Sequence, residues 1–239
     1  MNSSDSNNEQ AMLAEVGRAT ARLIHDFKNQ LGGLKLYTAY LKKRFAAHLD
    51  KADLAEALEI TDKINQSVNE MTEHANLIGK LTRPVELKLA DADFTSLVEQ
   101  AINQIRPTIA ERGLTLESDL AETSPIRLPI RLDAQQMLLA LGALLSRAIE
   151  ATVENGRLRI SLRSSEGKLQ LSIFDEGERL TEEQQQSFFD FLTNERLNKT
   201  SLNLALARRI IEAHDGQIVA LAAEASDLAG VEVRVRFEI

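Results

Sequence analysis

The chain has 239 residues, of which 44% are hydrophobic and 27% charged, and this predicts one or two globular domains with an ordinary core. Its net charge of −8 argues against a nucleic-acid partner, and the lack of cysteine excludes disulfides, thiolate catalysis and cysteine-ligated metals. No apolar run is long enough to span a membrane and the first residues lack the pattern of a signal peptide, so the expected location is the cytoplasm, without a membrane partner.

The first third of the sequence predicts a helical hairpin. Residues 1–9 are polar and are expected to form a disordered tail. Between residues 10 and 83, apolar positions recur every three or four residues, as at Leu23, Phe27, Leu31 and Leu34, which is typical of long amphipathic helices. A turn near residue 50 separates two helices, and the Arg83-Pro84 pair ends the second. Because a lone hairpin cannot bury such a seam, we expect a homodimer that forms a four-helix bundle.

Residues 84–239 predict a second domain of mixed strands and helices. Strands are expected at 85–89, 114–120, 126–132, 217–224 and 230–239, with a hairpin at 157–175; helices are expected at 94–113, 134–156 and 202–216. Residues 176–200 are polar and irregular. Strands and helices do not alternate strictly, so a mixed sheet with helices on one face, an α/β sandwich, fits best. The whole chain is therefore predicted to be α+β.

A histidine interrupts the apolar pattern of the first helix in the stretch HDFKNQL. At about 100° per residue, His25 lies about 160° from the mean direction of the seam, so it faces solvent. Such an imidazole can act as a nucleophile, with Asp26 to orient it or accept its proton. Asn29 can position a water, and Lys28 can balance the charge of a phosphoryl group. An exposed histidine without a function is the alternative.

HDFKNQL resembles the phosphoacceptor box of two-component histidine kinases, in which an acidic residue follows the histidine on the first helix of a dimeric four-helix bundle. The stretch LDAQQMLLALGALLSRAIEAT, residues 132–152, is similar to the helix that carries the asparagine box of the kinase ATP-binding domain. IFDEGERL resembles the first glycine box, in which Asp175 would read adenine and Gly177 would follow it. The resemblance covers about residues 12–239 and implies the kinase fold.

Several positions depart from the family pattern. Arg147 stands where the family has its Mg²⁺-binding asparagine, and a guanidinium cannot ligate a metal ion. Arg179 replaces the second glycine of the first glycine box. KTSLNL, residues 199–204, stands in place of the second glycine box and has no glycine to admit phosphates. Asp175 and Gly177 would bind nucleotide only if that function is retained, and otherwise form a strand-end turn.

Three functions follow from these residues. The main prediction is a histidine phosphotransferase that relays a phosphoryl group through His25 to or from a response-regulator aspartate, with a degenerate ATP-binding domain, its ATP-dependent activity lost, and no cofactor. The first alternative is an active, soluble histidine kinase that uses ATP and Mg²⁺ to phosphorylate His25. The second alternative is a non-catalytic or phosphatase module that binds a regulator or a partner kinase. His214, near a helix end, is predicted to be structural, and no residue spacing suggests a metal site.

Overall fold

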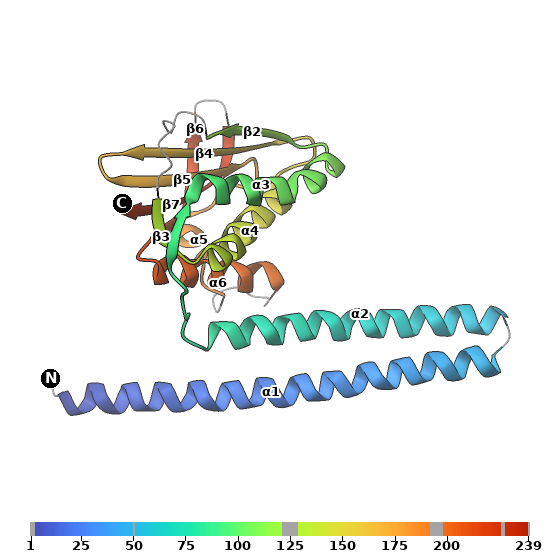
Figure 1. Cartoon of the computed structure of the whole chain (residues 1–239). Helices are drawn as coiled ribbons and strands as arrows, with labels where there is room; N and C mark the ends of the chain where they lie inside the picture. The colour runs from blue at the N-terminus through green and yellow to red at the C-terminus, as the bar shows by residue number, and fades with distance from the viewer. Residues whose placement is uncertain (1–2, 50, 121–128, 192–197, 226–227, 239) are drawn as a thin grey trace. The chain divides into compact units, whose positions relative to one another are not determined.

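The structure is a computed structural model that describes residues 3–49, 51–120, 129–191, 198–225 and 228–238, without the side chains of residues 3–19, 21–22, 51–52, 129, 224–225 and 228–229. Two compact units make up the chain, Met1–Pro84 and Val85–Ile239, and each has its own elements (Figure 1). Among the described residues, no helix is both long enough and apolar enough to cross a bilayer.

The first unit is a hairpin of two helices, α1 (Ser3–His48) and α2 (Lys51–Leu81). The helix begins at Ser3, earlier than the polar composition of residues 1–9 predicted, because each residue added to an existing helix gains a backbone hydrogen bond. Leu31 and Thr38 are buried on α1, where Thr38 donates a hydrogen bond to Asn65 of α2. The hairpin confirms the two predicted helices.

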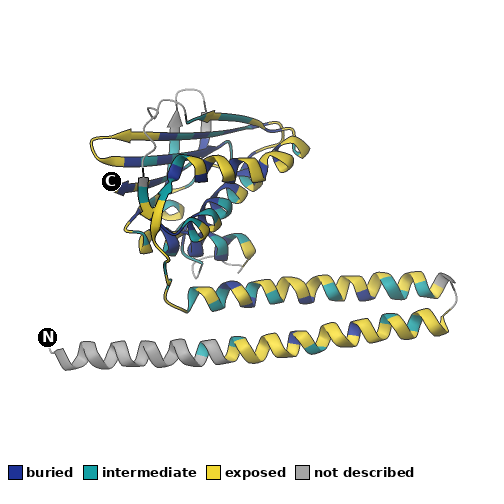
Figure 2. Ribbon diagram, viewed as in Figure 1, coloured by how far each residue is buried: buried dark blue, intermediate teal, exposed yellow. Residues whose placement is uncertain are grey.

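The predicted apolar seam divides into two stripes. Leu31 is 2% exposed and packs within the hairpin, whereas Leu23 is 70%, Phe27 43% and Leu34 46% exposed. On α2, Ile60, Ile64 and Met71 are exposed as well. The hairpin shown in Figure 2 therefore leaves an apolar surface uncovered on each helix.

The second unit is built on a five-stranded mixed sheet of order β2-β4-β5-β7-β6. Its strands are β2 (Thr115–Asp119), β4 (Arg157–Ser165), β5 (Lys168–Asp175), β6 (Gln217–Ala225) and β7 (Leu228–Glu238). Only β2 and β4 run parallel; the other neighbours are antiparallel. Glu166 and Gly167, at φ 51° and 75°, form the tight turn between β4 and β5 that the sequence predicted.

A separate two-stranded sheet pairs β1 (Ala90–Asp93) with β3 (Pro129–Leu132). The strand predicted at 85–89 is not formed, because the register of β3 runs from Ala90 opposite Leu132 to Asp93 opposite Pro129 and provides no partner further back. The predicted strand is therefore displaced towards the helix that follows.

Helices α3 (Phe94–Glu111), α4 (Ala134–Ala151) and α6 (Lys199–Ala213) lie on one face of the five-stranded sheet (Figure 1), and the short α5 (Glu182–Ser187) precedes α6. The core lies between this face and the helices, where alternate strand residues are buried: Leu158, Ile160, Leu162, Leu169, Leu171, Ile173, Val231, Val233 and Val235. Because strand side chains alternate between faces, the intervening polar residues lie on the other side. This arrangement confirms the predicted α/β sandwich.

Asp133 and His214 join three segments: the start of α4, the segment before β1 and the C-terminal end of α6. The carboxylate of Asp133 caps α4 by accepting from Gln136 N–H and also accepts from Lys88 N–H. His214 Nε2 accepts from Asp133 N–H at 2.9 Å, and its Nδ1 lies 2.7 Å from Ile210 O, so Nδ1 carries the proton and the ring is neutral. His214 is structural, as predicted, but it acts as a hydrogen-bond acceptor and not as a cation at a helix end.

Replacing His214 with alanine removes both of these hydrogen bonds and leaves the Asp133 N–H without its acceptor. We expect the free energy of unfolding of the His214→Ala variant to fall by about 1–3 kcal/mol, because a half-buried donor then loses its partner. Urea denaturation followed by circular dichroism measures this change. His48→Ala, at an exposed helix end, is the control and should change stability by less than about 0.5 kcal/mol; equal effects of the two substitutions would contradict the structural role.

Candidate functional site

His25 lies on α1 with 74% of its side chain exposed. Its Nδ1 atom is 3.5 Å from Asp26 Oδ1 and 3.4 Å from Asn29 Nδ2. The carboxylate only accepts and therefore favours a proton on Nδ1, whereas the amide nitrogen donates and favours the other tautomer. A proton on Nδ1 would let this atom donate to the Asp26 carboxylate and would leave the Nε2 lone pair facing solvent.

The structure thus brings His25, Asp26 and Asn29 together at one point of α1, and Lys28 is exposed on the same turn. A second feature of this face was missed in the sequence analysis. Leu36 and Tyr40, which are 71% and 58% exposed, follow His25 at 11 and 15 residues and so share its direction on the helix. Their position off the predicted seam is the signal that could have identified them.

Asp175 is the last residue of β5 and is fully buried, at 0% exposed. Its Oδ2 atom accepts a hydrogen bond from Arg147 of α4, while Oδ1 is the one buried side-chain polar atom without a hydrogen-bond partner in the described part of the chain. Burial raises the pKa of Asp175 to about 6, against the lowering effects of the Arg147 charge and of the Gly177 backbone N–H. A buried acceptor without a partner is rare in folded proteins and points to a ligand that supplies a donor.

Arg147 is held from both sides. Its guanidinium pairs with Asp175 and lies 4.7 Å from the centroid of the Phe188 ring, with 12% of the side chain exposed. Phe188 in turn packs edge-on against Phe189 at 4.9 Å. Burial lowers the pKa of Arg147, against the raising effects of Asp175 and Glu150. The contact of Arg147 with Phe188 was also missed, because nothing in the sequence relates a residue of α4 to the one just after α5.

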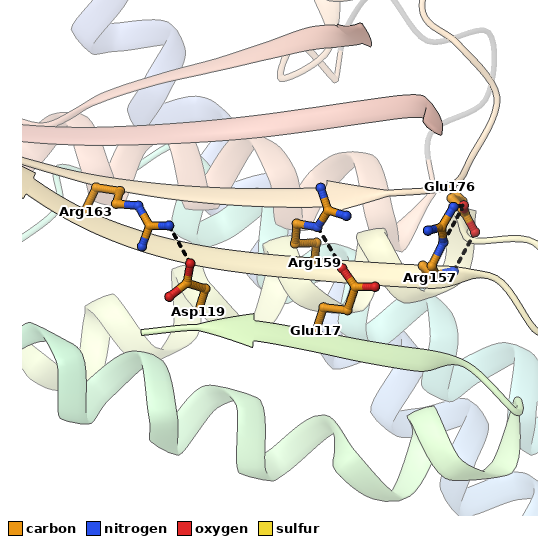
Figure 3. Close-up of polar contacts among 6 residues, drawn as sticks. All are labelled: Glu117, Asp119, Arg157, Arg159, Arg163 and Glu176. Atoms are coloured by element: carbon orange, nitrogen blue, oxygen red, sulfur yellow. Dashed lines mark hydrogen bonds and ion pairs between the residues drawn. The ribbon is translucent and has the colours of Figure 1, made fainter. Parts of the chain in front are cut away.

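Glu176 fixes the backbone directly after Asp175. Its carboxylate accepts from the Arg157 backbone N–H at 2.7 Å and pairs with the Arg157 guanidinium at 2.9 Å (Figure 3). Figure 3 also shows Arg159 with Glu117 and Arg163 with Asp119, which tie β4 to β2 on the open face of the sheet. These pairs hold the end of β5, and with it the Asp175 carboxylate, in a fixed position.

Gly177 allows the chain to pass close to Asp175. A Cβ atom at position 177 would lie 2.6 Å from Asp175 Oδ1 and 3.0 Å from Ala151 O, closer than side chains tolerate. Gly177 is thus required beside this oxygen, since any side chain there would crowd it. Arg179, two residues on, is exposed.

The segment KTSLNL forms the first turn of α6. Asn198 is the N-cap: its side chain accepts from Ser201 N–H at 2.8 Å, and the Ser201 hydroxyl lies 3.3 Å from Asn198 N–H. This capping box starts the helix at Lys199, three residues before the predicted start at 202, and satisfies backbone donors within the protein.

The residues around Asp175 meet the requirements of an adenine base better than those of a metal ion. The unpaired Oδ1 matches the amino group of adenine, which is a donor. Arg147, a permanent cation, lies beside the same carboxylate, and the described residues contain no cluster of three or more histidine, aspartate or glutamate side chains that could hold a metal. The site therefore fits a nucleotide base and does not fit Mg²⁺.

Part of this domain matches a known protein family. Residues 132–239 match the family described as histidine kinase-, DNA gyrase B-, and HSP90-like ATPase. The sensor histidine kinase ZraS of Klebsiella oxytoca is 26% identical over 208 residues, covering 86% of this chain and 43% of ZraS. The signal transduction histidine-protein kinase AtoS of Escherichia coli is 26% identical over 207 residues, covering 86% of this chain and 32% of AtoS. These matches support the histidine kinase family.

Solved histidine kinase structures share the fold. The catalytic domain of ThkA aligns with a TM-score of 0.56 and 22% identity, covering 63% of this chain and 95% of that domain. ThkA in complex with the response regulator TrrA aligns with a TM-score of 0.66 and 20% identity, covering 98% of this chain and 65% of that chain. The present chain spans less than half the length of ZraS and AtoS.

The main functional prediction, a histidine phosphotransferase relay on a degenerate kinase, is wrong. The relatives that match most of the chain are sensor histidine kinases, and the ATPase family matches residues 132–239, where the departures occur. The prediction gave too much weight to Arg147, Arg179 and residues 199–204, because the family match extends over all of these positions. The findings support the alternative, a kinase.

A pH titration of stability tests the burial of Asp175. The folded protein binds the Asp175 proton more tightly than the unfolded chain does, because burial raises the pKa from 3.8 to about 6. Relative to the Asp175→Asn variant, the native protein should therefore gain stability as the pH falls from about 6 towards about 4, by up to about 3 kcal/mol. Urea unfolding of both proteins across this range measures the difference.

Asp119→Asn is the matched control. The hydrogen bond from Arg163 lowers the pKa of Asp119, so the stability that this carboxylate contributes is lost as the pH falls, a trend of opposite sign. If the difference between the native protein and Asp175→Asn stays constant from neutral pH to about 4, the Asp175 carboxyl is not desolvated as the structure indicates.

Proposed function

We propose that this chain is the kinase part of a two-component histidine kinase, which phosphorylates His25 and passes the phosphoryl group to an aspartate of a response regulator. The observation that carries the proposal is the buried, unpaired Oδ1 atom of Asp175 in a domain of the kinase ATPase family, on a chain whose first helix presents an exposed histidine.

The histidine environment suits attack on a phosphorus atom. With the proton on Nδ1, the Nε2 lone pair is available, and its attack forms an N–P bond while the P–O bond to the leaving nucleotide breaks. The ring then carries a positive charge, which the Asp26 carboxylate stabilises at Nδ1. Lys28, exposed on the same turn, adds a cation near the transferred group. ATP, when bound, supplies the γ-phosphoryl group.

Asp175 and Gly177 are the residues proposed to hold the nucleotide. Asp175 Oδ1 would accept from the adenine amino group, and a side chain at position 177 would clash with that oxygen. Because Arg147 cannot ligate Mg²⁺, we assign no residue of the chain to a metal ion.

The partners proposed for the hairpin are a second copy of the chain and a response-regulator receiver domain. A second copy would cover the exposed stripe that contains Leu23, Leu34 and Ile64 and would complete a four-helix bundle. The receiver domain would meet the face of His25, where Leu36 and Tyr40 provide apolar contacts. The related ThkA was solved with such a regulator.

Labelling with ATP carrying a radioactive γ-phosphate tests the kinase directly. The purified chain, supplied with a divalent cation, should become labelled through a bond that is stable to base and labile to acid, as a phosphohistidine is. The His25→Gln variant should incorporate no label, and His74→Gln, altered on the other helix of the hairpin, should be labelled at the native level. A native protein that is folded but unlabelled would overturn the kinase assignment, and so would label on His25→Gln.

The Asp26→Asn variant tests the orienting role of the carboxylate. Asparagine keeps the size of the side chain but loses the charge that holds the proton on His25 Nδ1 and stabilises the product ring. The rate of labelling should fall by about 100-fold. The affinity for ADP, measured by calorimetry, should stay unchanged because Asp26 belongs to the first unit and Asp175 to the second. Equal labelling rates for the native chain and Asp26→Asn would assign the positioning of His25 to other groups.

A further inference from the structure

The two oxygens of the Asp175 carboxylate have different roles. Oδ2 is occupied by Arg147, which reaches it from α4, and Oδ1 has no partner although both atoms belong to a fully buried side chain. The ion pair therefore uses one oxygen of the carboxylate and leaves the other without a side-chain partner. Which kind of ligand this oxygen accepts depends on whether the carboxyl is ionised.

An ionised carboxylate is only an acceptor, whereas a protonated carboxyl carries an O–H donor. Purine bases differ in the group at position 6. A 6-amino purine such as adenine presents a hydrogen-bond donor there, and a 6-oxo purine such as hypoxanthine or guanine presents an acceptor. A site whose group can only accept forms a hydrogen bond with the amino group of a 6-amino purine. With a 6-oxo purine, the same group faces another oxygen in a buried site, and this lowers the affinity.

We infer that Arg147 sets the base specificity of this domain: by its ion pair it holds Asp175 as a hydrogen-bond acceptor, so that the site selects a 6-amino purine over a 6-oxo purine. The inference rests on the proposed nucleotide-binding function. It assigns to Arg147 a role in specificity, in contrast to the metal-binding role of the residue that the kinase family has at this position.

The surroundings of the pair support this role. Arg147 cannot easily turn away, because its guanidinium stacks on Phe188 at 4.7 Å and only 12% of the side chain is exposed. Glu150, one turn further along α4, is engaged by the Thr200 hydroxyl at 2.7 Å, and Glu176 is engaged by Arg157. Glu150 also attracts the Arg147 guanidinium, and the guanidinium itself donates to Asp175 Oδ2.

The titration behaviour agrees with the geometry. Burial raises the pKa of Asp175 to about 6 even with Arg147 in place, since desolvation outweighs the attraction of the guanidinium. Without that charge the pKa would rise further, and a larger fraction of the carboxyl would be protonated at neutral pH. In that fraction of molecules, the Asp175 carboxyl would present an O–H donor to the base in place of an acceptor.

Calorimetric titration of the full chain with ADP and with IDP, without metal, tests the inference. The two ligands differ only at the base, so the ratio of their dissociation constants reports recognition of the amino group. The native chain should prefer ADP, and Arg147→Met, which keeps the length and the contact with Phe188, should lower the ratio by about tenfold or more, as expected if the Asp175 pKa rises by one unit. Arg147→Lys, which keeps the charge, should retain most of the preference.

Arg163→Met is the matched control, because it removes an arginine that pairs with a carboxylate on the open face of the sheet, and its ratio should equal that of the native chain. An unchanged ratio in Arg147→Met would overturn the inference and leave the proposed function intact. A native chain that binds neither ligand would overturn nucleotide binding itself, and the inference with it.

The native chain also provides a test that does not depend on the folding of a variant. Its preference for ADP over IDP should fall when the pH is lowered from above about 7 to below about 6, as Asp175 takes up a proton. Titration of the phosphates affects both ligands alike and cancels in the ratio. A ratio that is independent of pH over this range would contradict an ionised Asp175 as the selecting group.

Discussion

The second unit depends on keeping one carboxylate out of water. Asp175 is fully buried, and the cost of removing its charge from solvent is only partly offset by Arg147, which is why burial raises its pKa to about 6. Several features act to keep it there: the Arg157–Glu176 pair at the end of β5, the absence of a side chain at Gly177, and the stack of Arg147 on Phe188. Proteins retain an arrangement of this cost mainly where it serves a ligand.

Gly230 shows how tightly this region is packed. A Cβ atom there would lie 1.9 Å from the backbone oxygen of Asp175, so β7 passes the end of β5 at a distance that only glycine permits. The strand that carries the carboxylate is therefore fixed by its neighbour as well as by its own side chains. The Asp175 carboxylate is therefore carried by a rigid element of the sheet and not by a loop.

The fold was largely predictable from the sequence, because it follows from periodicity. Alternation along 157–175 predicted the hairpin of β4 and β5, and the three- and four-residue spacing predicted the two long helices. The division of the apolar seam was not predictable, since which side of α1 faces α2 is decided by the packing of both helices. The strand expected at 85–89 was displaced for a similar reason: the partner β3 determines which residues pair.

The candidate sites were predictable to different degrees. His25 and Asp26 are adjacent in sequence, so their contact follows from the helix itself. The Arg147–Asp175 pair joins residues 28 positions apart on a helix and a strand, and no local pattern predicts it. Treating Arg147 only as a lost metal ligand led to the wrong function, because its actual contact with the carboxylate was unknown from the sequence.

The capped start of α6 bears on the dissociation rate of the nucleotide that this domain is proposed to bind. The side chains of Asn198 and Ser201 each accept a hydrogen bond from the other residue's backbone N–H. These N–H groups are therefore not available to bind phosphate oxygens. A ligand held chiefly by its base has few contacts to break, and differences in affinity between related sites arise mostly in the dissociation rate. We therefore expect rapid exchange of nucleotide, so that the occupied fraction would follow changes in the surrounding nucleotide pool with little delay.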